Sequence, residues 1–151
     1  MAKMMIWFDM DGTIADLYAV EGWLEALRNE ETTPYELAAP MLRMSVLARQ
    51  LNAVKRHGYG IGIISWCSKV STEEYDRRIA EAKKAWLMKH LPSVLWDAIE
   101  IVPYGTPKHE VCGSGFLFDD EEKNRTEWDK NAGMAFCPEH ITEVLSTLNR
   151  G

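Results

Sequence analysis

Short apolar runs alternate along the chain with longer segments in which apolar residues recur at helical spacing. The short runs predict strands at residues 4–8, 61–64, 98–102, 115–118 and 133–137. The segments between them predict helices at residues 41–57, 72–90 and 123–131, and a last helix that begins at Pro138. This alternation is typical of a parallel sheet covered by helices. We therefore predict an α/β fold, a three-layer Rossmann-like parallel sheet.

The segment from Asp16 to Pro40 interrupts this alternation. It contains one amphipathic stretch, with apolar side chains at Val20, Trp23 and Leu27, and a polar run follows. We interpret the segment as a small helical insertion after the first strand, placed as a partial cap over the site. Because 151 residues suffice for one well-buried domain, we expect a single domain over residues 1–151 with this cap inside it.

Composition and charge narrow the class of protein. The chain is 46% apolar and 26% charged, which is typical of a globular protein, and it has no apolar run near the roughly 20 residues of a membrane span. The formal net charge of −6 argues against strong binding to nucleic acid. The apolar start of the chain is cut off at Asp9, too early for a signal peptide. We expect a cytoplasmic protein with no membrane partner and with reduced thiols.

The string Asp9-Met10-Asp11-Gly12-Thr13 follows the first apolar strand. Residues i and i+2 of an extended segment point the same way, so Asp9 and Asp11 should face one place. Two carboxylates about 4 Å apart repel by about 4 kcal/mol at an effective dielectric near 20, and a cation or a shared proton must neutralise them. Gly12 supplies the permissive backbone of a tight turn. This string is the strongest chemical signal in the sequence.

The pair Asp119-Asp120 ends the fourth strand in the same way. Carboxyl ends of parallel strands meet at one edge of the sheet, where open α/β folds bind their ligands. Together with Asp9 and Asp11, the pair would make an oxygen-rich site suited to Mg²⁺, whereas no imidazole or thiol at ligand spacing favours zinc.

Two further elements would bind a phosphoryl group. Ser65 ends the second strand, and its hydroxyl and the amide of Trp66 could hold phosphate oxygens. Lys108, in the turn from Gly105 to Lys108, could hold the nucleophile and the phosphate together as a point charge. Each of these signals is weak alone, and their order along the chain strengthens all of them.

This order of motifs resembles the haloacid dehalogenase (HAD) superfamily of phosphotransferases. The resemblance runs from Phe8 to about Asn131. It implies that Asp9 attacks phosphorus and becomes an aspartyl phosphate, and that Asp11 protonates the leaving oxygen and then activates water. It also implies an Mg²⁺ cofactor held by the Asp9 carboxylate, the Asp11 backbone carbonyl and Asp119. Asp120 would be a further ligand or a partner of the ligands, and Ser65, Trp66 and Lys108 would bind the phosphoryl group.

A closer resemblance concerns the 5′(3′)-deoxyribonucleotidases. The opening motif from Asp9 to Asp16 is similar to theirs, and the run from Ser65 to Lys69 has the length and trailing lysine of their phosphate loop. The loop lacks their Ser-Pro, and the insertion at 16–40 is shorter than their cap. Trp23 and Trp66 are the two tryptophans that we would test for stacking on a base.

These observations together predict a hydrolase. We expect an Mg²⁺-dependent phosphatase that acts on a small phosphorylated metabolite, with a (deoxy)nucleoside monophosphate as one candidate. A polynucleotide 3′-phosphatase is the alternative within the enzymes; a non-catalytic phosphoryl-binding protein and a receiver-like domain phosphorylated on aspartate are alternatives outside them. A small cap leaves either an open site or one completed by a second subunit, so a homodimer is a further expectation.

Overall fold

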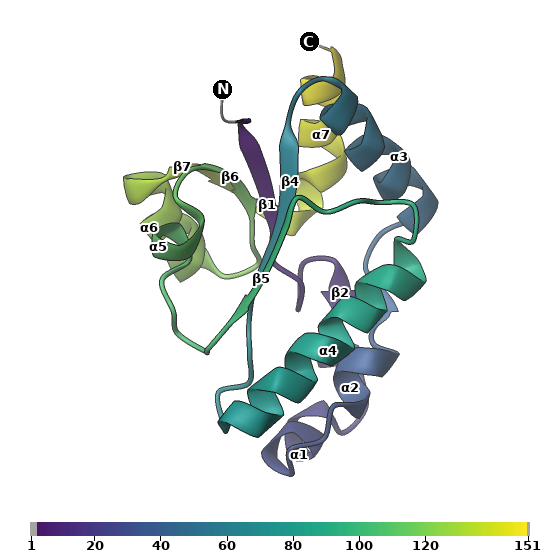
Figure 1. Ribbon diagram of the computed structural model, residues 1–151, viewed down its shortest axis with the longest axis vertical. Coiled ribbons are helices and arrows are strands. Elements are labelled where there is room, and N and C mark those ends of the chain that lie inside the picture. Colours follow the sequence, from purple (N-terminus) through teal and green to yellow (C-terminus); the bar gives the residue numbers. More distant parts are fainter. Residues whose placement is uncertain (1–2, 151) are drawn as a thin grey trace.

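Five parallel strands form the central sheet of the computed structural model, which describes residues 3–150 (Figure 1). Their spatial order is β5-β4-β1-β6-β7. The strands are β1 (Met5–Phe8), β4 (Gly60–Trp66), β5 (Ala98–Val102), β6 (Gly115–Phe118) and β7 (Gly133–Phe136). Each predicted strand is present, although β4 begins one residue earlier and ends two residues later than expected. The predicted α/β fold class is confirmed.

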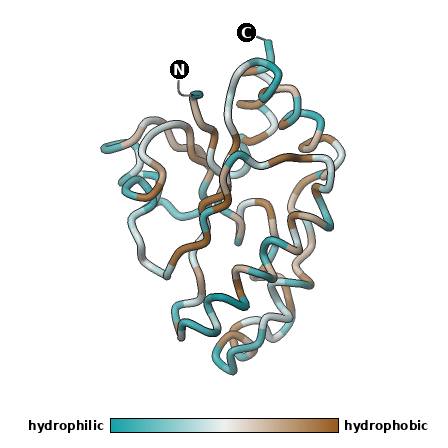
Figure 2. The backbone as a smooth tube through the Cα atoms, viewed as in Figure 1, coloured by the Kyte–Doolittle hydropathy of each residue, from teal (hydrophilic) through white to brown (hydrophobic). Residues whose placement is uncertain are grey.

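Side chains of β1 alternate between the two faces of the sheet. Ile6 and Phe8 are buried in a cluster with residues of α3 (Met44–Arg56) and α7 (Ile141–Arg150), whereas Trp7 is buried on the other face with Trp128 of α6 (Glu122–Asn131). Figure 1 shows α3 and α7 on one side of the sheet and α6 on the other. The apolar colour of Figure 2 follows the central strands, and the outer helices are largely hydrophilic. Burial of these side chains stabilises the sheet. The candidate site lies at the carboxyl ends of its strands.

The helices mostly begin and end where the sequence predicts. Thr72 caps α4 (Glu73–His90): its hydroxyl accepts a hydrogen bond of 3.1 Å from the backbone N–H of Tyr75. The last helix begins with a 3₁₀ turn, η2 (Pro138–His140), before α7. No helix within residues 3–150 is long and apolar enough to cross a membrane.

One prediction in this part of the chain was wrong. Lys108 does not lie in a turn but opens the short helix α5 (Lys108–Cys112), which Pro107 precedes. A five-residue helix is too short to show a periodic apolar pattern, so the Gly and Pro residues before it dominated the sequence signal.

The insertion is helical, as the sequence predicts, and both of its ends lie together. It contains η1 (Leu17–Ala19), α1 (Trp23–Arg28) and α2 (Thr33–Leu37). The flanking strands β2 (Ala15–Asp16) and β3 (Ala39–Pro40) pair antiparallel and close the segment. Helix α2 packs on α4, where the indole N–H of Trp86 donates a hydrogen bond of 2.8 Å to the carbonyl of Ala38. The segment is thereby fixed beside the carboxyl ends of the strands (Figure 1).

Candidate active site

A tight loop after β1 places the two aspartates of the first motif. The carbonyl of Met10 accepts hydrogen bonds of 2.9–3.0 Å from the backbone N–H groups of Thr13, Ile14 and Ala15. Gly12 has φ of +80°, and a Cβ there would lie 2.3 Å from Oδ2 of Asp120. Glycine is therefore favoured at this position for two reasons: the backbone is left-handed, and a Cβ would displace the side chain of Asp120.

The carboxylate of Asp9 is buried and held at both oxygens. Its Oδ1 accepts a hydrogen bond of 3.0 Å from Nζ of Lys108, and its Oδ2 accepts one of 3.1 Å from the hydroxyl of Thr13. A carboxylate fixed in this way can be presented to an incoming group without further ordering.

Lys108 joins Asp9 to the second acidic motif. Its buried ammonium also lies 2.6 Å from Oδ2 of Asp119 and 5.4 Å from the centre of the Trp66 ring. Burial alone would lower the pKa of Lys108, but the charges of Asp9 and Asp119 outweigh it and raise that pKa. The ammonium is therefore a permanent positive charge in the site.

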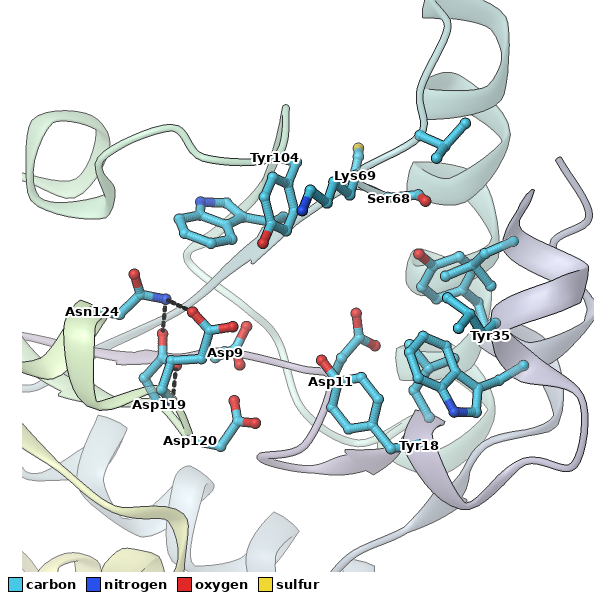
Figure 3. A pocket seen from close by; sticks show the side chains of 18 of the residues that line it. Asp9, Asp11, Tyr18, Tyr35, Ser68, Lys69, Tyr104, Asp119, Asp120 and Asn124 are labelled. Atoms are coloured by element: carbon cyan, nitrogen blue, oxygen red, sulfur yellow. Dashed lines mark hydrogen bonds between the residues drawn. The ribbon is translucent and has the colours of Figure 1, made fainter. Parts of the chain in front are cut away.

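Asp9, Asp119 and Asp120 form a cluster of carboxylates, hereafter the acidic cluster (Figure 3). One oxygen from each lies within 4.8 Å of the others. Asp119 is held further by the backbone N–H of Glu121 at 2.9 Å and by the side-chain amide of Asn124 at 3.2 Å. The predicted carboxylate ligands thus come together, whereas the side chain of Asp11 is not part of the cluster.

The charges of the acidic cluster are incompletely neutralised by the protein. Burial and the charge of Asp9 raise the pKa of Asp119 to about 6, although Lys108 opposes the shift. Burial and the charge of Asp9 likewise raise the pKa of Asp120 to about 8. Lys108 contacts two of these three crowded carboxylates, Asp9 and Asp119, so a hard divalent cation with oxygen ligands would fit the cluster well. The donor set therefore suits Mg²⁺, as the sequence predicts.

Ser65 and Trp66 lie side by side in β4 but face different surroundings. Ser65 pairs with Ile101 and is fully buried, and its hydroxyl oxygen accepts a hydrogen bond of 2.6 Å from Nζ of Lys83. Trp66 lines the pocket; its indole N–H donates 2.8 Å to the carbonyl of Thr106. That Ser65 and Trp66 bind a phosphoryl group stays a prediction.

Lys83 is one residue of this site that the sequence reasoning missed, along with Tyr18, Tyr104 and Asn124. Lys83 lies on α4, is 1% exposed, and its ammonium lies 2.8 Å from Oδ2 of Asp11. The buried stripe of this helix was predicted correctly as Tyr75, Ile79, Ala82, Trp86 and Leu87. Position 83 is four residues after Ile79 and three before Trp86, so a lysine inside an apolar stripe was the available signal.

The acidic cluster opens into a pocket of about 310 Å³. Asp9, Asp11, Lys108, Asp119 and Asp120 lie at its polar end. Its other walls are mainly apolar and aromatic, from Leu17, Tyr18, Trp23, Leu24, Leu27, Tyr35, Trp66, Val70 and Tyr104 (Figure 3). The pocket thus combines a carboxylate-rich end with aromatic walls, and small-molecule sites commonly combine a few polar groups with apolar walls in this way.

Other residues near the site differ in whether they line this pocket. Trp23 and Lys69 line it, and His109 is not among the described residues that do. Cys67 also lines it, but burial raises the pKa of its thiol to about 11, which disfavours the nucleophilic thiolate.

No family model matches this sequence, and no curated protein matches it. Among solved structures, the chain is similar to the crystal structure of D,D-heptose 1,7-bisphosphate phosphatase from Burkholderia thailandensis. The TM-score is 0.54, the alignment covers 87% of this chain and 75% of that chain, and 14% of the aligned residues are identical. At this identity the likeness shows the fold alone, a HAD-like Rossmann-like fold.

Proposed function

We propose that this protein is an Mg²⁺-dependent phosphomonoester hydrolase that acts through an aspartyl phosphate on Asp9. The observation that carries the proposal is the carboxylate of Asp9, which Lys108 and Thr13 hold beside a carboxylate pair at the end of a ligand-sized pocket. The fold likeness to a phosphatase agrees with this reading.

In the first step, a carboxylate oxygen of Asp9 attacks phosphorus and the bond from phosphorus to the leaving oxygen breaks. The carboxyl group of Asp11 gives its proton to that oxygen. Burial raises the pKa of Asp11, although Lys83 opposes the shift, and a raised pKa favours the protonated acid. In the second step, the Asp11 carboxylate takes a proton from water, whose oxygen attacks phosphorus. Inorganic phosphate leaves and the carboxylate of Asp9 is restored.

The residues that would hold Mg²⁺ are Asp9, Asp119 and Asp120 through their carboxylates and Asp11 through its backbone carbonyl. When bound, the cation neutralises phosphate charge and orients the phosphoryl group toward Asp9. Lys108 supplies a second, permanent positive charge at the same place.

The aromatic side chains that line the pocket favour a substrate that has a flat, partly apolar group. Tyr18 and Trp23 contact each other at a ring separation of 5.0 Å, and Trp66 and Tyr104 do so at 4.9 Å. All four rings line the pocket, and aromatic faces bind nucleobases by stacking. These rings support a (deoxy)nucleoside monophosphate as the substrate that we propose, with residues 16–40 as its cap.

The test is phosphate release in the presence of Mg²⁺ from nucleoside monophosphates, sugar phosphates and a 3′-phosphorylated oligonucleotide. We expect turnover of nucleoside monophosphates by the wild type and by Glu25→Gln, which changes an exposed carboxylate, and none by Asp9→Asn. Turnover of only the oligonucleotide would indicate a polynucleotide 3′-phosphatase. A phosphorylated Asp9 that persists without turnover would indicate a receiver-like domain, and binding without reaction a non-catalytic protein.

A further inference from the structure

Lys83 has no part in the reaction described above, yet its side chain is the charged group of α4 that is buried against the site. An ammonium has three N–H donors. Here its nitrogen contacts three acceptors: Oδ2 of Asp11 at 2.8 Å, the hydroxyl of Ser65 at 2.6 Å and the carbonyl of Trp66 at 2.8 Å. The fourth neighbour is the ring of Tyr35, whose centre lies 5.0 Å away.

These contacts leave Lys83 no donor for a substrate. Lys83 is also not among the described residues that line the pocket, so any effect on the reaction must pass through its neighbours. Burying an ammonium is costly unless its donors are satisfied, and Asp11, Ser65 and Trp66 supply one acceptor for each of the three N–H groups. The ammonium therefore fixes the positions of its three acceptors relative to one another.

Lys83 donates hydrogen bonds to the side chains of Asp11 and Ser65. Each of these side chains has one further polar group that Lys83 does not engage. Lys83 engages Oδ2 of Asp11, and within residues 3–150 no hydrogen bond engages Oδ1. Lys83 also donates to the oxygen of Ser65, so the hydroxyl proton of Ser65 is directed away from the ammonium. Asp11 lines the pocket and its free oxygen can carry the proton for the leaving group, whereas Ser65 is fully buried and is not among the described residues that line the pocket.

We propose that Lys83 is a positioning residue for phosphoryl transfer, because it holds the carboxyl group of Asp11 in a fixed orientation while the buried hydroxyl of Ser65 anchors the ammonium. This inference rests on the proposed function and adds a role that acts through Asp11. Loss of Lys83 should therefore matter most where the leaving oxygen needs a proton.

The experiment compares kcat/KM for an alkyl phosphate, whose alkoxide leaves only when protonated, with that for 4-nitrophenyl phosphate, whose phenolate leaves without a proton. Lys83→Met removes the ammonium and keeps the length of the side chain. We expect it to lower the alkyl value by at least about tenfold more than the aryl value, which is the selectivity expected when general acid catalysis is impaired. Lys84→Met, at the next and exposed position of α4, should leave both values unchanged.

An equal loss with both substrates, or no loss with either, would overturn the inference, since a merely structural role does not depend on the leaving group. Where Lys83→Met does not fold, Asp11→Asn is compared with the double variant Asp11→Asn/Lys83→Met, which leaves no buried charge unpaired. The two should show the same ratio of aryl to alkyl kcat/KM, and a further change in the double variant would contradict a role through Asp11. A wild type that releases phosphate neither from these two esters nor from the nucleoside monophosphates and sugar phosphates would instead refute the proposed function itself, and the role of Lys83 with it.

Discussion

Lys108 Nζ lies 3.0 Å from Oδ1 of Asp9, a contact between side chains 99 residues apart in the chain. The same ammonium contacts Asp119 at 2.6 Å. It therefore ties the loop after β1 to the end of β6 and places a positive charge beside the proposed nucleophile. A charge in this position stabilises the negative charge that is redistributed as phosphorus is attacked.

Replacing Lys108 should impair catalysis more than folding. Lys108→Met keeps most of the buried stem but removes the charge, and we expect kcat to fall by about 10²–10³-fold, the usual effect of deleting one preorganised electrostatic contact. Steady-state kinetics with saturating Mg²⁺ measures this loss. Lys123→Met, which changes an exposed lysine, is the control and should retain full activity. A Lys108→Met protein with wild-type kcat would remove Lys108 from the proposed mechanism.

Gly12 should be needed for the metal site rather than for the fold in general. A Cβ at position 12 would lie 2.3 Å from Oδ2 of Asp120, so Gly12→Ala should displace Asp120 and weaken Mg²⁺ binding. The rise in melting temperature on addition of Mg²⁺ measures this binding. Gly58→Ala is a matched control, because Gly58 has φ of +96° but no atom within 4 Å of its Cβ position.

The backbone strain of an alanine at positive φ is common to both variants. Both should therefore melt earlier than the wild type without metal, and only Gly12→Ala should lose the Mg²⁺-dependent rise. If the two variants respond equally to Mg²⁺, the approach of Gly12 to Asp120 has no bearing on the metal.

How far the sequence predicts this site depends on how local each signal is. Asp9 and Asp119 could be found because each directly follows an apolar run that reads as a buried strand, and parallel strands bring their ends together. The position of Lys108 near them was predicted from its charge and its order along the chain, and then by the resemblance, but its helix was not predicted. Lys83 reaches Asp11 across 72 residues of sequence; its place in the apolar stripe of α4 predicts that it is buried but not that Asp11 is its partner.

The sequence pattern also does not predict the strand order or the contacts of the insertion. The pattern predicts five strands but not that β1 lies between β4 and β6, because each apolar run is compatible with several neighbours. The two-residue strands β2 and β3 are too short to show alternation, although their pairing is what closes the insertion.

The exposed ring of Tyr18 should contribute to substrate selection. Tyr18 is 48% exposed and lines the pocket beside Trp23, so its removal should cost little stability. We expect Tyr18→Ala to raise KM for a nucleoside monophosphate by about tenfold, equivalent to the lower range of one base-stacking contact, with kcat little changed. KM for a small alkyl phosphate should be unaffected. Tyr18→Phe retains the ring and should behave as the wild type; an equal rise for both substrates would argue against stacking.

The acidic cluster should make the metal-free protein less stable as the pH rises. The pKa of Asp120 is raised from 3.8 to about 8, mainly by burial and then by the charge of Asp9. A carboxyl group with a raised folded-state pKa stabilises the folded protein fully below its unfolded pKa, and this contribution is lost as the pH rises through the folded pKa. For Asp120 the loss therefore extends from about pH 4 to about pH 8.

Asp120→Asn isolates this contribution, because an amide does not ionise. In EDTA, the melting temperature of Asp120→Asn should exceed that of the wild type by a margin that grows between pH 4 and pH 8, whereas Glu74→Gln, at an exposed position, should show no such trend. Mg²⁺ should reverse the order at pH 8, because a bound cation stabilises the ionised carboxylate that only the wild type has. A margin that is constant across this range would mean that Asp120 is not held protonated by its surroundings.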